Sequence, residues 1–412
     1  MCSLLKLAYK NVFRNFRRSL LTFIAISLGL GLSIIMICFQ LGFEMQAINL
    51  TIDTKTSHLK LYGSGYTDEK KTLSLDYTIN NYEELLENLK QIRGIKNCAP
   101  RILFSGYLND GIDELMCIGA GIDPESENRI FNREESVIRG EYLVPGEEKM
   151  LLGEDLAELF KVNTGDYLTV VTRTKYGTIA ALDFEIKGII DSGNPQVDNQ
   201  YFFIPLDIAQ EILETENQVS EISLKLNNKN NLHNIKNVIF SHPDYKDKFE
   251  AETYIEMLKD LIRLFSIRKK AIVIIAGIFL LMAAAGIANT MLMSVFERTK
   301  EIGTMMAIGM KPNKIVSLFC LEAAFIGIFG SIIGCGFGSV VTYYYEVNGI
   351  NLESTGVDKL KELPISSTMY ADLIPEIVLF VFVLGIIISV LSALYPAVKA
   401  SRLVPSEALR KV

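Results

Sequence analysis

The sequence has few of the side chains that usually build catalytic or metal centres. Only three histidines occur among the 412 residues, and none of His58, His233 and His242 has a neighbour at metal-ligand spacing. Neither a G-x-S-x-G nor an H-E-x-x-H motif is present. The sequence therefore predicts no catalytic residue and no metal site, although carboxylates that are distant in sequence can still meet in space.

A second absence concerns ATP. The chain has no G-x-x-x-x-G-K-[ST] loop and no Gly-Lys pair, so it lacks the device with which P-loop proteins cradle ATP phosphates. We expect this chain to bind no cofactor, and any energy that it uses to come from another protein.

Charge is nearly absent from four long segments. Of all residues 49% are hydrophobic and only 22% are charged, and the mean hydropathy is +0.26, which argues against an ordinary soluble domain. A helix needs about 20 apolar residues to cross a hydrocarbon core of about 30 Å. The segments therefore predict four transmembrane helices, at 19–43, 271–296, 315–345 and 377–398. A cleaved signal peptide is the alternative for the first, but that segment is longer than a signal peptide's apolar core and no A-x-A site follows it.

Lysines and arginines near the helix ends predict the orientation. Such residues mark 1–18, 297–314 and 399–412 as cytoplasmic, whereas the loop 346–376 is acidic and fits the opposite side. A large domain at 44–270 is then extracytoplasmic. We expect a multi-pass protein with both termini in the cytoplasm.

The segment 44–270 alternates predicted strands and helices, which indicates a mixed α/β domain. The predicted strands are 57–62, 167–172, 184–190 and 222–226, and the predicted helices are 82–90, 152–160, 206–213 and 231–239. Asn80 or Asn81 is available to cap the helix 82–90. Cys98 and Cys117 are interpreted as buried free thiols, with a disulfide as the alternative in an oxidising compartment. The net charge of −7 and the lack of a basic patch give no indication of nucleic-acid binding.

Small residues predict close packing among the membrane helices. Three glycines, Gly330, Gly334 and Gly338, share one face of the third helix, and Gly385 lies in the fourth. Glu322 is the only ionisable residue near the membrane interior, so no chain of acids and bases for a proton relay is present. The pattern favours a packed bundle over an ion-coupled carrier.

The segment between the second and third helices reads ERTKEIGTMMAIGMKPNKI, residues 297–315. Helical spacing predicts a short apolar face, with charges beside it that can fix register with a partner: Ile302, Met305, Met306 and Gly309, with Arg298 and Glu301. Gly309 suits a helix end, and Pro312 suits the first turn of the next helix. A membrane-surface helix with a solvated polar side is the alternative.

This segment resembles the cytoplasmic coupling segment of the FtsX/MacB superfamily, the type VII ABC transporter permeases. The family pattern R-T-x-E-I-G-x-x-x-A-x-G is matched by Arg298, Thr299, Glu301, Ile302, Gly303, Ala307 and Gly309. Glu322 with the glycines that follow it, the L-G-x-x-L-A … V-x-x-G-D element at 152–166, and the tail 395–410 match further family motifs. The resemblance covers the whole chain in order.

The resemblance implies a fold and a mechanism. The fold is four transmembrane helices with an extracytoplasmic MacB-like α/β domain between the first and second, in a dimer with an identical or related permease. Two copies of a cytoplasmic ABC ATPase, which use ATP and Mg²⁺, would drive motion of that domain. The expected ATPase-coupling residues are Arg298, Glu301, Ile302, Gly303, Met305, Met306 and Gly309. The chain starts with an amphipathic helix suited to membrane lipid, so we expect a separate ATPase and no enzyme activity in this chain.

Several roles within the family compete. The stretch 57–66 resembles the lipoprotein-releasing branch, which implies release of lipoproteins from the bacterial inner membrane to a periplasmic carrier. MacB-like export of another substrate, FtsX-like mechanical signalling and a non-transport scaffold are the alternatives. The large domain at 44–270 disfavours the FtsX-like role.

Overall fold

The computed structural model describes residues 2–14, 16–69, 72–351, 368–405 and 408. It divides into two compact units, which we call the helical unit and the α/β domain. The helical unit comprises Met1–Glu44, Leu264–Ile350 and Met369–Val412, and the α/β domain comprises Met45–Arg263 and Asn351–Thr368. The parts of the predicted loop and tail at 352–367, 406–407 and 409–412 lie outside the described residues.

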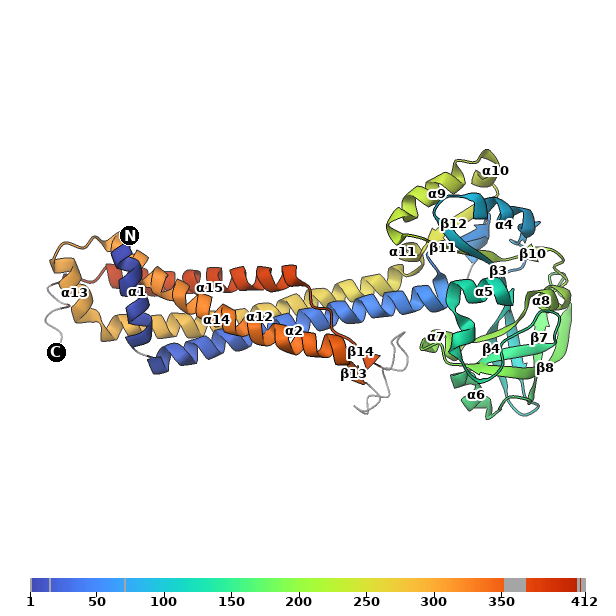
Figure 1. Cartoon of the computed structure of the whole chain (residues 1–412), viewed down its shortest axis with the longest axis horizontal. Coiled ribbons are helices and arrows are strands. Elements are labelled where there is room, and N and C mark those ends of the chain that lie inside the picture. Colours follow the sequence, from blue (N-terminus) through green and yellow to red (C-terminus); the bar gives the residue numbers. More distant parts are fainter. Residues whose placement is uncertain (1, 15, 70–71, 352–367, 406–407, 409–412) are drawn as a thin grey trace. The chain divides into compact units, whose positions relative to one another are not determined.

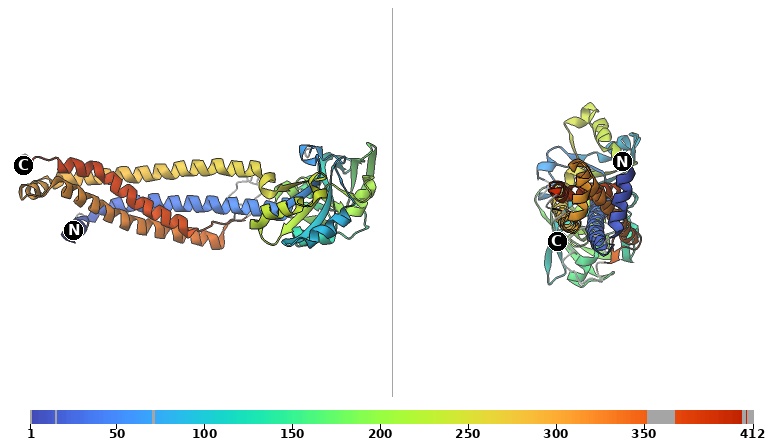
Figure 2. Two further views of the ribbon diagram at one scale, coloured as in Figure 1. Left: turned by 90° about the horizontal axis from the view of Figure 1, so that it is seen from above. Right: turned by 90° about the vertical axis from the view of Figure 1, so that its left-hand side faces the viewer.

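Four long helices dominate the helical unit and gather as one bundle in the end-on view of Figure 2. They are α2 (Phe16–Thr51), α12 (Lys259–Glu297), α14 (Pro312–Asn348) and α15 (Pro375–Ser401). Each is long and apolar enough to cross a membrane, which confirms the predicted four-helix fold class. Both α2 and α12 extend beyond the segments 19–43 and 271–296, because a helix need not end where its apolar part ends. A short helix, α1 (Cys2–Arg14), precedes them, and α13 (Thr299–Ala307) connects α12 to α14.

Glycines let these helices touch through their backbones. A Cβ atom built on Gly334 would lie 2.7 Å from a backbone oxygen of α2, and one on Gly338 would lie 2.9 Å from another. Gly330 faces the Ile26 side chain of α2, and a Cβ atom built on Gly385 of α15 would lie 2.5 Å from the Ser331 hydroxyl of α14. The four predicted packing glycines therefore all lie at helix contacts.

The α/β domain is built on a ten-stranded mixed sheet (Figure 1). Its strand order is β12-β1-β11-β3-β4-β9-β6-β8-β5, with β7 paired to β3 and β8. The pairs β4–β9 and β6–β8 are parallel, and the other pairs are antiparallel. The long hairpin of β3 and β4 runs in register from Arg101↔Ile122 to Asn109↔Glu114. The strands of this sheet are β1 (Leu59–Gly63), β3 (Ile95–Asn109), β4 (Glu114–Ile122), β5 (Val137–Gly140), β6 (Lys149–Gly153), β7 (Tyr167–Arg173), β8 (Ile179–Ile190), β9 (Tyr201–Pro205), β11 (Glu221–Leu226) and β12 (Phe249–Thr253).

Short helices and a small second sheet complete this domain. The two-stranded sheet pairs β2 (Ile79–Asn80) with β10 (Gln218–Val219). The helices are the π-helical turn η1 (Ile52–Thr56), α3 (Tyr66–Glu69), α4 (Tyr82–Gln91), α5 (Pro124–Phe131), η3 (Arg133–Ser136), α6 (Glu154–Phe160), α7 (Pro195–Asp198), α8 (Leu206–Ile212), η4 (Lys229–Asn231), α9 (Leu232–Phe240), α10 (Pro243–Lys246) and α11 (Tyr254–Met257). Local sequence explains some of their starts: the Asp123 carboxylate accepts the Ser126 N–H at 3.1 Å to cap α5, and Thr253 with Glu256 forms a capping box on α11.

Two local predictions need comment. Asn81 stands at the N-cap position of α4, but its side chain makes no capping hydrogen bond. Its backbone is left-handed, with φ 51° and ψ 45°, whereas a capping side chain normally projects from an extended backbone. Of the two predicted candidates, Asn80 and Asn81, the second takes the N-cap position, but the predicted capping hydrogen bond is absent. Cys98 and Cys117 are both free and buried, as interpreted from the sequence.

Five of the buried charged side chains in the described part of the α/β domain lie together, and we call them the buried ion cluster. The Glu127 carboxylate forms ion pairs with Arg101 at 2.6 Å and with Arg133 at 2.5 Å. The Glu221 carboxylate forms an ion pair with Lys60 at 2.5 Å, and the Arg101 guanidinium lies 3.6 Å from it. Every one of these side chains is at most 7% exposed. The cluster thereby ties β1, β3, β11, α5 and η3 together.

Candidate coupling site

The helix α13 has well-defined ends. Gly309 follows it with φ +98°, a left-handed conformation that glycine adopts without strain. The Gly309 N–H bonds to Met306 O and the Met310 N–H bonds to Met305 O, each at 3.0 Å, which is the Schellman arrangement of a helix end. Pro312 then opens α14. The segment between the two membrane helices is therefore a short, rigidly terminated helix.

Arg298, just before α13, anchors this helix to α14. Its guanidinium Nη1 donates to both carboxylate oxygens of Glu322, at 2.9 and 3.2 Å, and its Nε donates to Glu301 at 2.9 Å. Arg298 is 5% exposed and Glu322 is 4% exposed. The acid predicted near the membrane interior thus has a buried arginine as its partner, which offsets the cost of keeping a charge away from water.

The helix α1 joins the same group. The Asn11 Nδ2 donates to Glu322 at 2.6 Å, and Arg14 pairs with Glu301 at 2.9 Å. We call Asn11, Arg14, Arg298, Glu301 and Glu322 the polar clamp. It connects α1, α13 and α14 through charge-assisted hydrogen bonds, which are the stronger kind.

The contacts within the clamp shift the pKa values of Glu301 and Arg298. Burial alone would raise the pKa of Glu301, but hydrogen bonds from Arg14 and Arg298 hold that pKa below its usual value. Burial alone would lower the pKa of Arg298, and Glu322 reverses this, so that pKa is raised. Glu301 and Arg298 therefore stay ionised at neutral pH.

One side of α13 packs into the helical unit. Ile302 has no exposed surface and belongs to the same hydrophobic core as Val12, Ile315 and Phe319. Gly303 is also buried, and a Cβ atom on it would lie 2.8 Å from the Cβ of Ala408. These two predicted coupling residues lie inside this chain rather than on a surface open to a partner.

The other side of α13 is accessible. Ile308, at the C-terminal end of the helix, is 83% exposed. Lys300 and Thr304 are also exposed. Met305 and Met306 share the face of Ile302, where they are half-buried and pack against the core of the helical unit. The exposed Ile308, together with the uncovered parts of the two adaptable methionines, makes a small apolar surface of the kind that a partner protein covers.

Sequence reasoning found some members of this site and missed others. It singled out Arg298, Glu301 and Glu322 separately but did not pair them, and it gave Asn11 and Arg14 no role in the segment. The rule that an acid within a membrane helix needs a partner was the available signal. Among the described residues, no group of three or more His, Cys, Asp or Glu is arranged to hold a metal ion.

Two family matches together cover most of the chain. Residues 19–239 match the MacB-like periplasmic core domain, and residues 273–405 match the FtsX-like permease C-terminal family.

Curated relatives extend this similarity over the full length. The chain is 23% identical to the lipoprotein-releasing system transmembrane protein LolC of Neisseria meningitidis, over 97% of this chain and 95% of that protein. It is 24% identical to the uncharacterized ABC transporter permease YknZ of Bacillus subtilis, over 98% of each chain. It is also 24% identical to the pyoverdine export ATP-binding/permease protein PvdT of Pseudomonas fluorescens, over 98% of this chain but 58% of that protein. Among solved structures, the periplasmic region of MacB from Actinobacillus actinomycetemcomitans matches at 16% identity and a TM-score of 0.37, covering 52% of this chain and 95% of that one.

Proposed function

This chain belongs to the ABC transporter permeases that combine an FtsX-like C-terminal region with a MacB-like periplasmic core domain, and from that premise we propose that it couples ATP hydrolysis by a separate ATPase to motion of its α/β domain. The α/β domain lies outside the cytoplasm in this proposal, and both termini lie inside, at a bacterial inner membrane. The ATPase, in two copies, holds ATP and Mg²⁺. This chain acts as a permease subunit beside an identical or related second permease.

The polar clamp is the observation that supports this proposal. A helix that receives force must be fixed to the elements that it moves, because a loose helix would absorb the displacement. The helix α13 is fixed on its inner side by Ile302 and Gly303 and at its start by Arg298. Its accessible surface carries Ile308, while Met305 and Met306 are half-buried and also pack against the core of the helical unit. We assign ATPase docking to that accessible surface, and we assign Arg298 and Glu301 to holding α13 against α1 and α14.

Substituting Ile308 tests the docking surface. Ile308→Asp places a charge where the partner's apolar side chains are expected, and since Ile308 is 83% exposed the change leaves the core intact. We expect the ATPase to be lost when the tagged permease is purified in mild detergent. Ile112→Asp is the matched control, because Ile112 is 89% exposed on the hairpin of the α/β domain. If the two variants, Ile308→Asp and Ile112→Asp, recover equal amounts of the ATPase, the surface around Ile308 is excluded as the docking site.

For the substrate, we propose lipoprotein released from the inner membrane to a periplasmic carrier. The similarity to LolC along 97% of this chain supports this assignment. Purification after mild detergent extraction tests it: a bound triacylated lipoprotein beside the ATPase is the expected result. A cell-wall hydrolase or a periplasmic adaptor in place of the lipoprotein would overturn it in favour of mechanical signalling or export.

Export of another substrate is the second candidate. The similarity to PvdT, which spans 98% of this chain, favours it. Export of a small compound from cells that requires this chain and its ATPase, with lipoprotein release unchanged when the chain is deleted, would support this role.

A further inference from the structure

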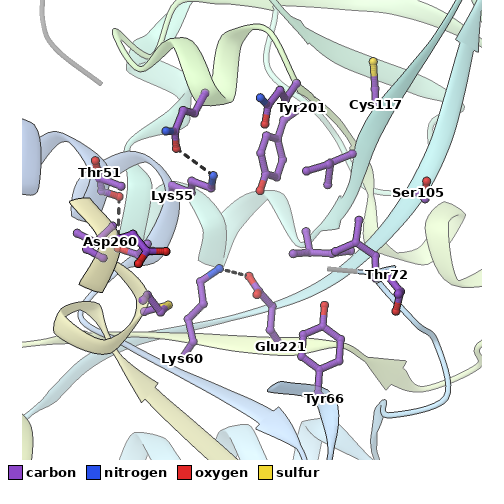
Figure 3. A pocket seen from close by; sticks show the side chains of 18 of the residues that line it. Thr51, Lys55, Lys60, Tyr66, Thr72, Ser105, Cys117, Tyr201, Glu221 and Asp260 are labelled. Carbon is purple, nitrogen blue, oxygen red and sulfur yellow. Dashed lines mark hydrogen bonds and ion pairs between the residues drawn. The ribbon is translucent and has the colours of Figure 1, made fainter. Parts of the chain in front are cut away.

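A cavity of about 910 Å³ lies within the α/β domain, and the coupling proposal makes no use of it (Figure 3). Its lining comes from η1, from strands β1, β3, β4, β9 and β11, and from the residues around the start of α12. Small-molecule sites have volumes of about 300–1,000 Å³. The cavity is therefore large enough for a ligand of that size.

The lining has two kinds of surface. Apolar side chains form one part: Leu103, Met116, Ile118, Leu258 and Leu261. Polar side chains form the other: Lys60, Tyr66, Tyr201 and Glu221. In Figure 3 the hydroxyls of Tyr66 and Tyr201 point toward the same space, next to the ion pair of Lys60 and Glu221. A molecule in this space meets an apolar wall and a group of hydrogen-bonding atoms together.

One oxygen of Glu221 has no partner among the described residues. Glu221 is completely buried, and its Oε1 accepts from Lys60 Nζ at 2.5 Å while its Oε2 accepts nothing. A buried carboxylate oxygen left without a donor is costly, so native proteins rarely retain one without a bound molecule.

Tyr66 presents a second such atom. Its side chain is 1% exposed, and its hydroxyl has no hydrogen bond of good geometry to any residue that the structure describes. The neighbouring Ser220 Oγ donates to Arg101 O and accepts the Leu103 N–H, so it has one lone pair left to accept from Tyr66 and no proton to give it. Burial raises the pKa of Tyr66, and it raises the pKa of Tyr201 to about 12, so both hydroxyls keep their protons at neutral pH.

We propose that this cavity binds an amphiphile with a hydroxylated head group, such as an acylglycerol or an alkyl glycoside. One head-group hydroxyl donates to Glu221 Oε2 and a second exchanges a hydrogen bond with Tyr66 Oη. The alkyl chain lies against Leu103, Met116 and Leu258. This site is independent of ATPase docking, so the two proposals stand or fall separately.

Electrostatics favours a hydroxyl over an ammonium at this position. An ammonium donating to Glu221 Oε2 would approach Lys60, at 2.5 Å from the same carboxylate, and Arg101, at 3.6 Å from it. Like charges at such distances repel strongly in a buried site. A hydroxyl supplies the missing proton donor without adding a charge.

Photo-crosslinking of the full chain in lipid nanodiscs tests this site. One arm places a photoreactive monodecanoylglycerol in the bilayer, and the other adds a photoreactive hexyl glucoside in solution. We expect labelled peptides containing Met116 or Leu258 in at least one arm, and the arm that labels identifies membrane or solution as the source. Excess monodecanoylglycerol should remove this label, whereas methyl decanoate, which has no hydroxyl, should not.

Matched tyrosine variants test the head-group contact. Tyr66→Phe should reduce cavity labelling about tenfold, as expected for one lost hydrogen bond in a buried site. Tyr62→Phe is the control, because Tyr62 is equally buried and stacks on Tyr66 at 5.0 Å, but its hydroxyl meets Met257 Sδ at 3.7 Å. Met116→Trp, at a position 64% exposed, narrows the cavity without changing a buried residue and should also reduce the label. Labels confined to the helical unit, equal competition by methyl decanoate, or equal effects of the two tyrosine variants would overturn the proposal.

Discussion

Each of the two units holds charged side chains away from water, but they do so in different ways. In the α/β domain all five members of the buried ion cluster are at most 7% exposed. In the helical unit the polar clamp is buried only at Arg298 and Glu322, whereas the side chains of Arg14 and Glu301 are 49% and 47% exposed. The cluster joins strands and helices of one sheet domain, and the clamp joins α1 and α14 to α13, the helix to which we assign coupling. The exposed Arg14–Glu301 pair of the clamp can break without leaving a buried charge unpaired, because water solvates both side chains, whereas the buried Arg298–Glu322 pair cannot.

The largest effect is expected in the cluster, from Glu127→Gln. Arg101 and Arg133 share this carboxylate and hold the pKa of Glu127 below its usual value despite burial. Without it two buried guanidiniums lose their common partner, so we expect the free energy of unfolding of the α/β domain to fall by about 3–5 kcal/mol. Urea-dependent proteolysis of the full chain measures this loss.

Glu125→Gln is the control for that substitution. Glu125 lies in the same helix, α5, and pairs with Arg129, but its side chain is 77% exposed. We expect a change below about 0.5 kcal/mol, as for other exposed pairs one turn apart. Comparable losses for the two variants would remove the distinction between buried and exposed charge on which the comparison rests.

The buried end of the clamp should give the next largest effect. Arg298→Gln, Glu322→Gln and the double variant form a double-mutant cycle, and we expect an interaction energy of about 0.5–3 kcal/mol in the unfolding of the helical unit. Each single variant should retain the ATPase, because Ile308 is untouched, and should lose coupled ATP turnover. This result would distinguish residues that fix α13 to α14 from residues that bind the ATPase. Loss of ATPase binding in Glu322→Gln, with the helical unit still folded, would show that the clamp itself forms the docking surface.

The solvated end of the clamp should matter less. Arg14→Gln removes one exposed ion pair with Glu301, at 2.9 Å, while Arg298 keeps its contact with the same carboxylate. We expect a loss of at most about 1 kcal/mol at low salt, and a smaller loss at high salt because exposed charges are screened. Thermal unfolding at two salt concentrations measures it. A loss independent of salt would mean that this end of the clamp is effectively buried.

The sequence predicted the membrane architecture well because its signal is strong. Long segments without charge can hardly form anything else, and the four long helices confirm the predicted fold class. Gly309 and Pro312 stand where helix-terminus chemistry predicts them, after α13 and at the start of α14. The predicted strands of the α/β domain were those with clear alternation, such as 167–172 in β7.

The missed features depend on contacts that are distant in sequence. The long strand β3 was not predicted, because Cys98, Pro100 and Gly106 interrupt its alternation, and it is held as a strand by β4, β7 and β11. The clamp was missed for the same reason, since Asn11 and Glu322 are 311 positions apart. Helical spacing placed Ile302 on an apolar face correctly but could not say whether that face turns to a partner or to the chain's own core.

The smallest expected effect is a pH dependence at the solvated end of the clamp. The pKa of Glu301 is held below its ordinary value of about 4.3 by Arg14 and Arg298 in the folded protein. A group whose pKa is lowered on folding contributes stability above its unfolded pKa and loses that contribution as the pH falls through the folded pKa. The difference in unfolding temperature between the unmodified chain and Arg14→Gln should therefore be constant from neutral pH down to about pH 5 and should narrow below it. Comparing the two proteins at each pH cancels the titration of other carboxylates. A difference that persists unchanged well below the ordinary pKa of glutamate would mean that Arg14 stabilises α1 by packing rather than by its charge, and the two ends of the clamp would then differ in kind and not only in exposure.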